Sequence, residues 1–169
     1  AIRRAEQWIL ERTKFSDGLA AIYPSMMYVE MALDVLGYPK DHPDVIEARN
    51  QFQRLMANRD KDFFFMPCFS PVWDTAIATH ALGEAGTIAP ASFRSTADWL
   101  LTKEVRRKGD WSIKRPDTEP SGWYFEFANE FYPDIDDTAQ VLLGLAHAKA
   151  SDSAAQKACM DRAVNWLLA

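Results

Sequence analysis

The sequence predicts an all-α fold built from consecutive helix pairs. One short helical phrase, an aromatic residue with aliphatic residues close to it, recurs at 5–10, 97–101 and 164–168, with a weaker copy at 51–55. Neighbouring copies lie roughly 45 residues or more apart, a period typical of repeats that each hold two or three helices. Between the copies, helical periodicity is found at 24–37, 71–86 and 134–148. Together, the four copies and the three segments between them predict about seven helices. No segment has a convincing strand pattern.

Two of the expected helices begin at recognisable residues. The segment 71–86 carries Asp74 near its start, where an acid can cap a helix and where the helix macrodipole stabilises negative charge. The segment 134–148 follows Pro133, whose fixed φ suits the first turn of a helix. Asp-Thr-Ala opens both segments, at 74–76 and at 137–139, as expected for equivalent positions in a ring of repeats.

Composition narrows the class of protein. The chain has 169 residues, of which 48% are hydrophobic, enough to bury a core. Its net charge is −5, with 19 Lys and Arg against 24 Asp and Glu, which argues against nucleic-acid binding. Two cysteines, Cys68 and Cys159, make no disulfide framework, and no His or Cys pair has metal-ligand spacing, so we expect a reducing compartment. The sequence contains no run of 18 apolar residues of the kind that would indicate a bilayer-spanning helix.

The most informative stretch is 132–138, which places three carboxylates, those of Asp134, Asp136 and Asp137, within four residues. Taken alone, Asp-x-Asp-Asp is common at the start of a helix, where aspartate caps the backbone N–H groups. The preceding stretch 122–129, however, holds four aromatic residues. A loop that only had to reach a helix would not need so many rings.

A carboxylate cluster beside aromatic rings has a specific chemical use. Carboxylates at hydrogen-bonding distance cannot all ionise, and apolar surroundings penalise the charged form, so one acid keeps its proton at neutral pH. Aromatic faces would stabilise a cation formed when that proton is transferred. The pattern therefore indicates the protonation of an alkene. The helix N-terminus opposes it by stabilising the ionised acids, so burial or a cationic partner must decide which oxygen holds the proton.

Four segments in this order, 70–75, 109–116, 125–129 and 134–139, closely resemble the bacterial squalene–hopene cyclases, a family of class II triterpene cyclases. The Asp-x-Asp-Asp motif alone is shared with class II diterpene cyclases. The resemblance covers essentially the whole chain, but members of the family are several times longer, so we expect this chain to be an internal piece. It implies two fused α/α barrels (toroids), with 1–65 closing the inserted barrel and 66–169 beginning the catalytic barrel as a partial ring.

The resemblance implies acid-initiated cyclisation of squalene to hopene or hopanol in hopanoid biosynthesis, with no cofactor and no metal. Asp136 matches the family's proton donor, and Asp134 and Asp137 match the flanking carboxylates that tune it. In the family this acid is hydrogen-bonded to a histidine well downstream, which would lie beyond Ala169. We therefore expect residues 1–169 alone to be inactive.

The resemblance also assigns residues to the substrate cavity. Trp73 and Phe125 match aromatic residues that stabilise cations, whereas the rings of 123, 124 and 127 are expected to serve packing. Ile22 matches a residue of the cavity wall. The remaining residues fall where the family arranges ordered water near the site of deprotonation; they are Tyr23, which replaces the Gln of some members, Pro24 and Tyr28.

The recurring phrase corresponds to the QW motif of the family, in which a Gln binds the start of a neighbouring helix and a Trp stacks on that Gln. The match runs from Trp99 to Trp111, with Glu104 at the place of the Gln. A glutamate can still accept hydrogen bonds from backbone N–H groups, so we expect Glu104 to bind the start of a neighbouring helix as the Gln does. We call this contact the brace. The copy near the N-terminus has Thr13 and Ala20 at the Gln and Trp places.

The three histidines are expected to be surface or internally satisfied side chains: His42 because it lies in the loop 40–43, and His80 and His147 because they lie on helices without acidic partners at hydrogen-bonding spacing. The expected partners are squalene and one leaflet of the bacterial cell membrane, approached monotopically from the cytoplasmic face, and the resemblance admits a homodimer. We expect no nucleic-acid partner. Two alternatives remain: another class II terpene cyclase with a diterpene or different triterpene substrate, and a non-catalytic α/α-toroid interaction module.

Overall fold

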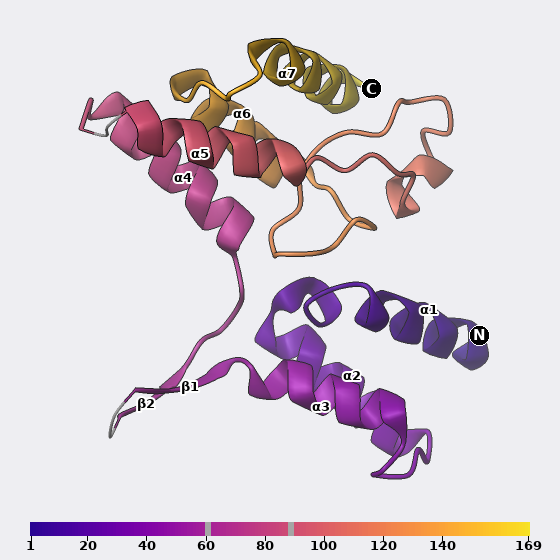
Figure 1. The fold of residues 1–169 in the computed structure, drawn as a ribbon. Coiled ribbons are helices and arrows are strands. Elements are labelled where there is room, and N and C mark those ends of the chain that lie inside the picture. Colours follow the sequence, from indigo (N-terminus) through magenta and orange to yellow (C-terminus); the bar gives the residue numbers. More distant parts are fainter. Residues whose placement is uncertain (60–61, 88–89) are drawn as a thin grey trace. The chain divides into compact units, whose positions relative to one another are not determined.

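The computed structural model describes residues 1–59, 62–87 and 90–169, and this part of the chain is mostly helical (Figure 1). Its α-helices are α1 (Ile2–Lys14), α2 (Tyr23–Val35), α3 (Pro43–Gln53), α4 (Pro71–Glu84), α5 (Pro90–Thr102), α6 (Ile135–His147) and α7 (Ser153–Leu168). Two short 3₁₀ helices, η1 (Leu19–Ala21) and η2 (Asp110–Ile113), lie in connecting loops. The prediction of an all-α fold of helix pairs is confirmed, and the helices lie where the repeated phrase and the intervening segments place them.

One short hairpin departs from that prediction. Strand β1 (Met56–Arg59) pairs in antiparallel fashion with β2 (Asp62–Phe65), so that Met56 lies opposite Phe65. The expectation of no strand is wrong here. The aromatic run of β2 favours extended backbone, but each strand has only four residues, too few to show a clear alternation in the sequence.

The chain forms two compact units. Unit 1 consists of residues 1–70 and 126–129, and unit 2 consists of residues 71–125 and 130–169. In unit 1, α2 packs against α3 around a small buried core made of Val29, Leu33, Val45 and Ala48. The hydroxyl of Tyr38 donates to a carboxylate oxygen of Glu6 on α1, at 2.5 Å, which ties the first helix to this pair.

Unit 2 is organised around the pairing of α4 with α6, which lie side by side (Figure 1). Gly144 allows the close approach, since a Cβ at this position would lie 3.0 Å from the carbonyl oxygen of Ala76. The two helices run parallel, because Ala76 meets Gly144 and His80 meets His147, one turn further along both. The buried core around them includes Val72, Leu100, Trp123, Val141 and Leu145.

Glu104 braces unit 2 in a different way from the one expected. Both oxygens of its buried carboxylate bind the guanidinium of Arg162 on α7, at 3.0 and 2.6 Å. The hydroxyl of Ser121 donates to the same carboxylate at 2.7 Å. A charged arginine thus takes the place of the backbone N–H groups that we expected as partners. The glutamate fits here because α7 supplies the opposite charge.

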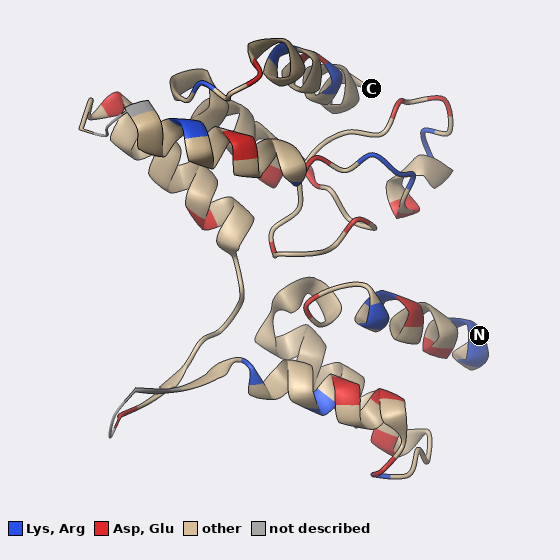
Figure 2. Cartoon of the chain, viewed as in Figure 1, with Lys and Arg blue, Asp and Glu red and all other residues tan. Residues whose placement is uncertain are grey.

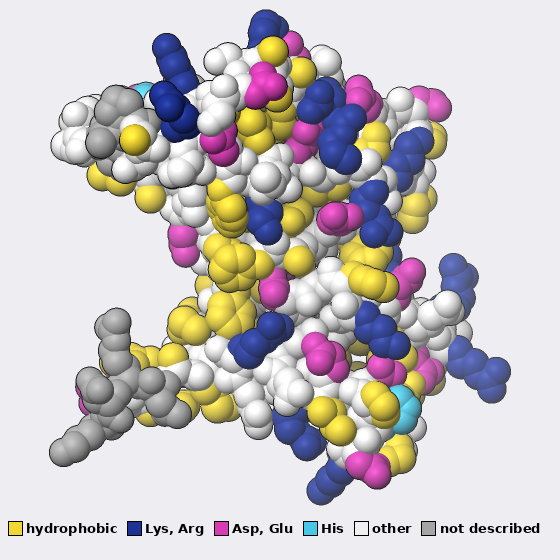
Figure 3. Space-filling model, in the orientation of Figure 1, with side chains coloured by type: hydrophobic (Ala, Val, Ile, Leu, Met, Phe, Trp, Pro, Cys, Tyr) yellow, Lys and Arg dark blue, Asp and Glu magenta, His cyan; other side chains and the backbone are white. Residues whose placement is uncertain are grey.

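The surface carries charges of both signs. Acidic and basic residues occur in both units (Figure 2), and they are mixed with hydrophobic side chains on the face shown in Figure 3. Within the described residues, no helix is both long enough and apolar enough to cross a bilayer.

Candidate active site

The start of α6 is held by an exchange of hydrogen bonds with the loop before it. Asp134 is the N-cap residue, and its carboxylate accepts the N–H of Asp137 at 2.8 Å. The backbone N–H of Asp134 donates to the carbonyl of Trp123, and the N–H of Trp123 donates to the hydroxyl of Thr138 at 3.0 Å. The loop and the first turn of α6 are therefore fixed to each other in both directions.

Trp123 anchors this arrangement in the core. Its side chain is fully buried, and its indole N–H donates to the carbonyl of Leu100 at 2.7 Å. Gly122 adopts φ +99°, and a Cβ there would come within 2.8 Å of the Thr138 hydroxyl oxygen. Only glycine leaves room for the Thr138 hydroxyl, which accepts the hydrogen bond from the N–H of Trp123.

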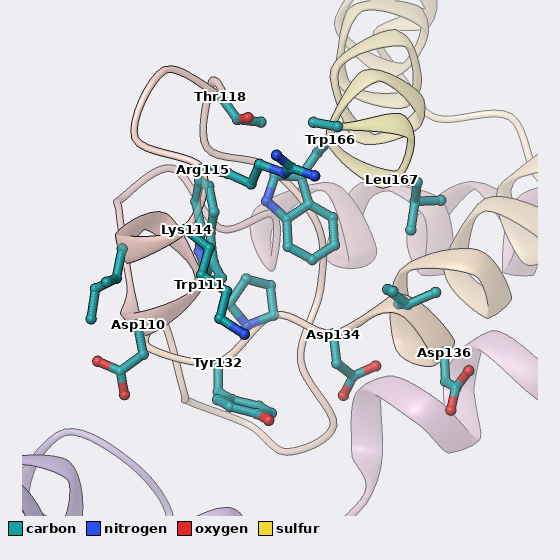
Figure 4. A pocket seen from close by; sticks show the side chains of 14 residues that line it. Asp110, Trp111, Lys114, Arg115, Thr118, Tyr132, Asp134, Asp136, Trp166 and Leu167 are labelled. Carbon is teal, nitrogen blue, oxygen red and sulfur yellow. The ribbon is translucent and has the colours of Figure 1, made fainter.

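The first turn of α6 opens on a cavity of about 940 Å³ within unit 2 (Figure 4). Its walls include Trp111 from η2 and Trp166 from α7, whose rings meet edge to face with centroids 5.7 Å apart. Asp134 and Asp136 line the same cavity, and their carboxylates point to one side in Figure 4, away from the ring of Trp166. Carboxylates and aromatic rings thus share one space.

The three acids differ in exposure. Asp137 is buried at 3% exposure, Asp134 is half-buried, and Asp136 is exposed. The bond that Asp134 accepts holds its carboxylate at the start of the helix. In the described part of the chain neither Asp134 nor Asp136 forms an ion pair.

The two aromatic residues expected to stabilise cations belong to unit 2 but do not line the cavity. Trp73 lies in the first turn of α4 and is half-buried. Because α4 and α6 run parallel, Trp73 lies at the same end of the helix pair as Asp136. Phe125 is half-buried in the loop before α6, next to the buried Tyr124.

The aromatic residues expected to serve packing behave differently from one another. Trp123 and Tyr124 are buried, as expected, whereas Phe127 is 51% exposed and belongs to unit 1. Asp74 lies within the first turn of α4 rather than at its first residue.

The residues expected near the site of deprotonation all belong to unit 1. Ile22 forms an antiparallel bridge with Cys68, and the N–H of Tyr23 donates to the carbonyl of Pro67 at 2.9 Å. The ring of Tyr23 also contacts Phe52 and Phe65, with centroids 5.7 and 5.2 Å away. Two further residues lie on α2, namely Pro24 in its first turn and Tyr28, which is exposed. None of the four lines the cavity of unit 2.

The partners of the histidine side chains differ from those expected at one position, His147. His42 is satisfied as expected, since its ring accepts the N–H of Asp44 at the start of α3. His147, by contrast, has an acidic partner: its Nε2 lies 3.1 Å from a carboxylate oxygen of Glu84. His80 stacks on His147 with ring centroids 5.5 Å apart. Spacing along one helix did not reveal this contact, because α4 and α6 each supply part of it.

Sequence reasoning overlooked Thr138 as the residue that fixes the loop, and Arg162 as the partner of Glu104. It did single out the phrases containing Trp111 and Trp166, which wall the cavity, but assigned them only to the repeat. Their shared position beside the acids follows from η2 and α7 meeting in space. Periodicity along the chain carries no signal for such a meeting.

Comparison with known proteins decides the family. The squalene-hopene cyclase C-terminal domain matches residues 69–169, and the squalene-hopene cyclase N-terminal domain matches residues 1–61. The chain belongs to the squalene–hopene cyclase family. The prediction made from the four segments is thereby confirmed.

Individual members of the family resemble the chain along nearly its whole length. It is 41% identical over 161 residues to a squalene–hopene cyclase of Zymomonas mobilis, covering 90% of this chain and 24% of the relative. It is 38% identical over 171 residues to a squalene–hopene cyclase of Bradyrhizobium diazoefficiens, and 33% identical over 167 residues to one of Alicyclobacillus acidocaldarius. These two alignments cover 99% and 98% of this chain and 26% of each relative. The chain thus spans about a quarter of the length of the curated relatives that it matches.

Proposed function

We propose that this chain carries the proton-donating part of an enzyme that cyclises squalene to hopene or hopanol, an isomerase of the class II type. The observation that carries the proposal is the placement of Asp134 and Asp136 at the start of α6, on a cavity walled by Trp111 and Trp166. Membership of the squalene–hopene cyclase family supports the choice of squalene over other prenyl chains.

Asp136 is the proton donor in this proposal. Asp134 is engaged as the helix cap, where it accepts the N–H of Asp137, whereas the exposed Asp136 lines the cavity, where an alkene can reach it. Asp134 and the buried Asp137 are the flanking carboxylates of the same cluster, and neighbouring carboxylates influence one another's release of a proton.

The reaction needs no redox step and no cofactor. The carboxyl group of Asp136 gives its proton to one carbon of a terminal alkene of squalene, and the π electrons of that alkene form the new C–H bond. The cation left on the neighbouring carbon is attacked by the next alkene, which forms a C–C bond, and ring closures follow. Loss of a proton yields hopene, and attack by water yields hopanol. Trp73 and Phe125 stabilise the cations along this path.

The remaining assignments are part of the same proposal. Residues 1–65 close an inserted α/α barrel, and 66–169 begin the catalytic barrel. By the family resemblance, Ile22 belongs to the wall of the substrate cavity of the complete enzyme, and Tyr23, Pro24 and Tyr28 arrange water where the final cation is quenched. The enzyme lies monotopically on the cytoplasmic face of the cell membrane, and squalene enters from that membrane. Residues 1–169 by themselves do not turn over substrate.

Proton transfer from a carboxyl group can be tested with isotope-labelled solvent. The enzyme containing this chain is incubated with squalene in D₂O, and the products are analysed by mass spectrometry. Hopene carrying one deuterium, at the carbon that accepts the first proton, is the expected product, because the carboxyl proton exchanges with solvent. Turnover of a prenyl diphosphate with no turnover of squalene would favour the other class II cyclases. Folded enzyme inert towards both substrates would favour a non-catalytic module.

A further inference from the structure

At the C-terminal ends of α4 and α6, two histidines and one carboxylate converge. His80 and Glu84 lie four residues apart on α4, so they share one face of that helix, and His147 is the last residue of α6. The three side chains can each offer a ligand atom, and these atoms lie within 4.8 Å of one another. Nε2 of His147 and Oε1 of Glu84 are already 3.1 Å apart.

We propose that His80, Glu84 and His147 bind one Zn²⁺ ion. Two imidazoles and one carboxylate are a ligand set that zinc accepts, with water completing a tetrahedral site. Ligand atoms in such a site lie about 2.0–2.2 Å from the metal. The imidazole rings lie nearly parallel, at 22°, so binding tilts them towards a shared ion. The Glu84 side chain is 68% exposed and is free to make the larger adjustment.

The surroundings of both histidines suit such a site. The side-chain amide of Gln140 lies 3.4 Å from Nδ1 of His80, and with this amide turned so that its oxygen accepts the Nδ1–H, the tautomer that leaves Nε2 to the metal is held. His147 packs directly against Gly83, where a Cβ would lie 2.4 Å from the Cγ of His147. The missing side chain at 83 therefore makes the space in which the second imidazole approaches α4.

The proposed zinc site lies at the opposite end of α6 from the proposed proton donor. Asp136 lies in the first turn of α6 and His147 at its end, about 16 Å away for 11 residues at the usual helical rise. Zinc bound here would hold the distal ends of two parallel helices whose other ends carry Trp73 and Asp136. Its effect is a cross-link that stabilises the folded state rather than a step in the cyclisation.

Titration calorimetry with ZnCl₂ on the full chain, purified without a histidine tag, tests the proposal. One equivalent should bind, and the melting temperature from circular dichroism should rise with zinc. Glu84→Gln changes an exposed side chain, so its fold should be retained while zinc affinity falls about tenfold or more. Gly83→Ala removes no ligand atom, but displaces His147, and should weaken binding by a similar factor, about tenfold.

His42→Ala is the matched control, because it removes a histidine of unit 1 that lies outside the cluster. It should bind zinc as the unchanged chain does. His147→Ala should abolish the stoichiometric binding. The proposal is overturned if no saturable zinc binding is found, or if Glu84→Gln or His147→Ala binds zinc with unchanged affinity.

Discussion

Glu104 and Arg162, 58 residues apart in the sequence, form a two-point ion pair that joins the end of the α5 segment to α7. Burial alone would raise the pKa of Glu104, but the hydrogen bonds from Arg162 and Ser121 outweigh it and hold that pKa below its usual value. The same pair raises the pKa of Arg162. Burial, with the nearby Glu104 carboxylate, raises the pKa of the Cys159 thiol to about 12. Glu104 is therefore the charged centre of this brace.

Replacing Arg162 should destabilise the fold. Arg162→Met leaves the Glu104 carboxylate buried without its main partner, and we expect the free energy of unfolding to fall by about 2 kcal/mol. Urea denaturation followed by circular dichroism measures the change. Lys157→Met is the control, since it removes an exposed ion pair with Asp161 on the same helix and should cost about 0.5 kcal/mol or less. Equal losses in the two variants would contradict a structural role for the Glu104–Arg162 pair.

The lowered pKa of Glu104 predicts a pH dependence of stability. Because this pKa is lower in the folded than in the unfolded chain, the ionised carboxylate stabilises the fold above the usual glutamate value of about 4.5. The contribution is lost as pH falls through the folded-state value. Glu104→Gln should therefore be less stable than the unchanged chain at about pH 7, and the difference should shrink towards about pH 3. Denaturation series at several pH values measure it, and a difference independent of pH would refute the assignment.

The hydroxyl of Thr138 should matter for the loop that precedes α6. Thr138→Val leaves the buried N–H of Trp123 without an acceptor, which should cost about 1–3 kcal/mol of unfolding free energy. Thr138→Ser keeps the hydroxyl and should retain most of the stability. Thermal melts of the two variants measured side by side make the comparison. If serine costs as much as valine, lost methyl packing rather than the hydrogen bond explains the effect.

Local sequence signals were sufficient for the helices. Repeated aromatic phrases mark α1, α5 and α7, and Pro133 with Asp134 marks the start of α6, where the structure places the N-cap at Asp134. These signals act within one or two turns of backbone. The hairpin of β1 and β2 was missed because its strands of four residues pair only with each other.

Contacts between distant segments were beyond sequence reasoning. Glu104 was expected to bind backbone N–H groups, because nothing in its neighbourhood indicates that α7 presents Arg162 there. His147 was expected to lack an acid, because Glu84 comes from another helix. The acids of the motif were found from spacing and resemblance, but their unequal burial follows from how the first turn of α6 packs.

Removing the proposed proton donor should stop the reaction without unfolding the protein. Asp136→Asn replaces an exposed carboxyl group with an amide that has no proton of suitable acidity, so we expect squalene turnover to fall by about a hundredfold or more. Gas chromatography of products from folded enzyme measures it. Asp110→Asn, another acid lining the same cavity, is the control and should keep turnover within a small factor. Normal hopene output from Asp136→Asn would remove Asp136 as the donor.

Removing the aromatic ring of Phe125 should change which products form. If its face stabilises an intermediate cation, Phe125→Ala deprives that cation of about 1–2 kcal/mol and allows earlier loss of a proton. We therefore expect products with fewer rings alongside hopene, detected by gas chromatography coupled to mass spectrometry. Phe127→Ala, two residues away and exposed, should leave the product spectrum unchanged. Slower turnover of Phe125→Ala with an unchanged spectrum would show that the ring serves packing, because lost packing alone slows the enzyme without releasing intermediates early.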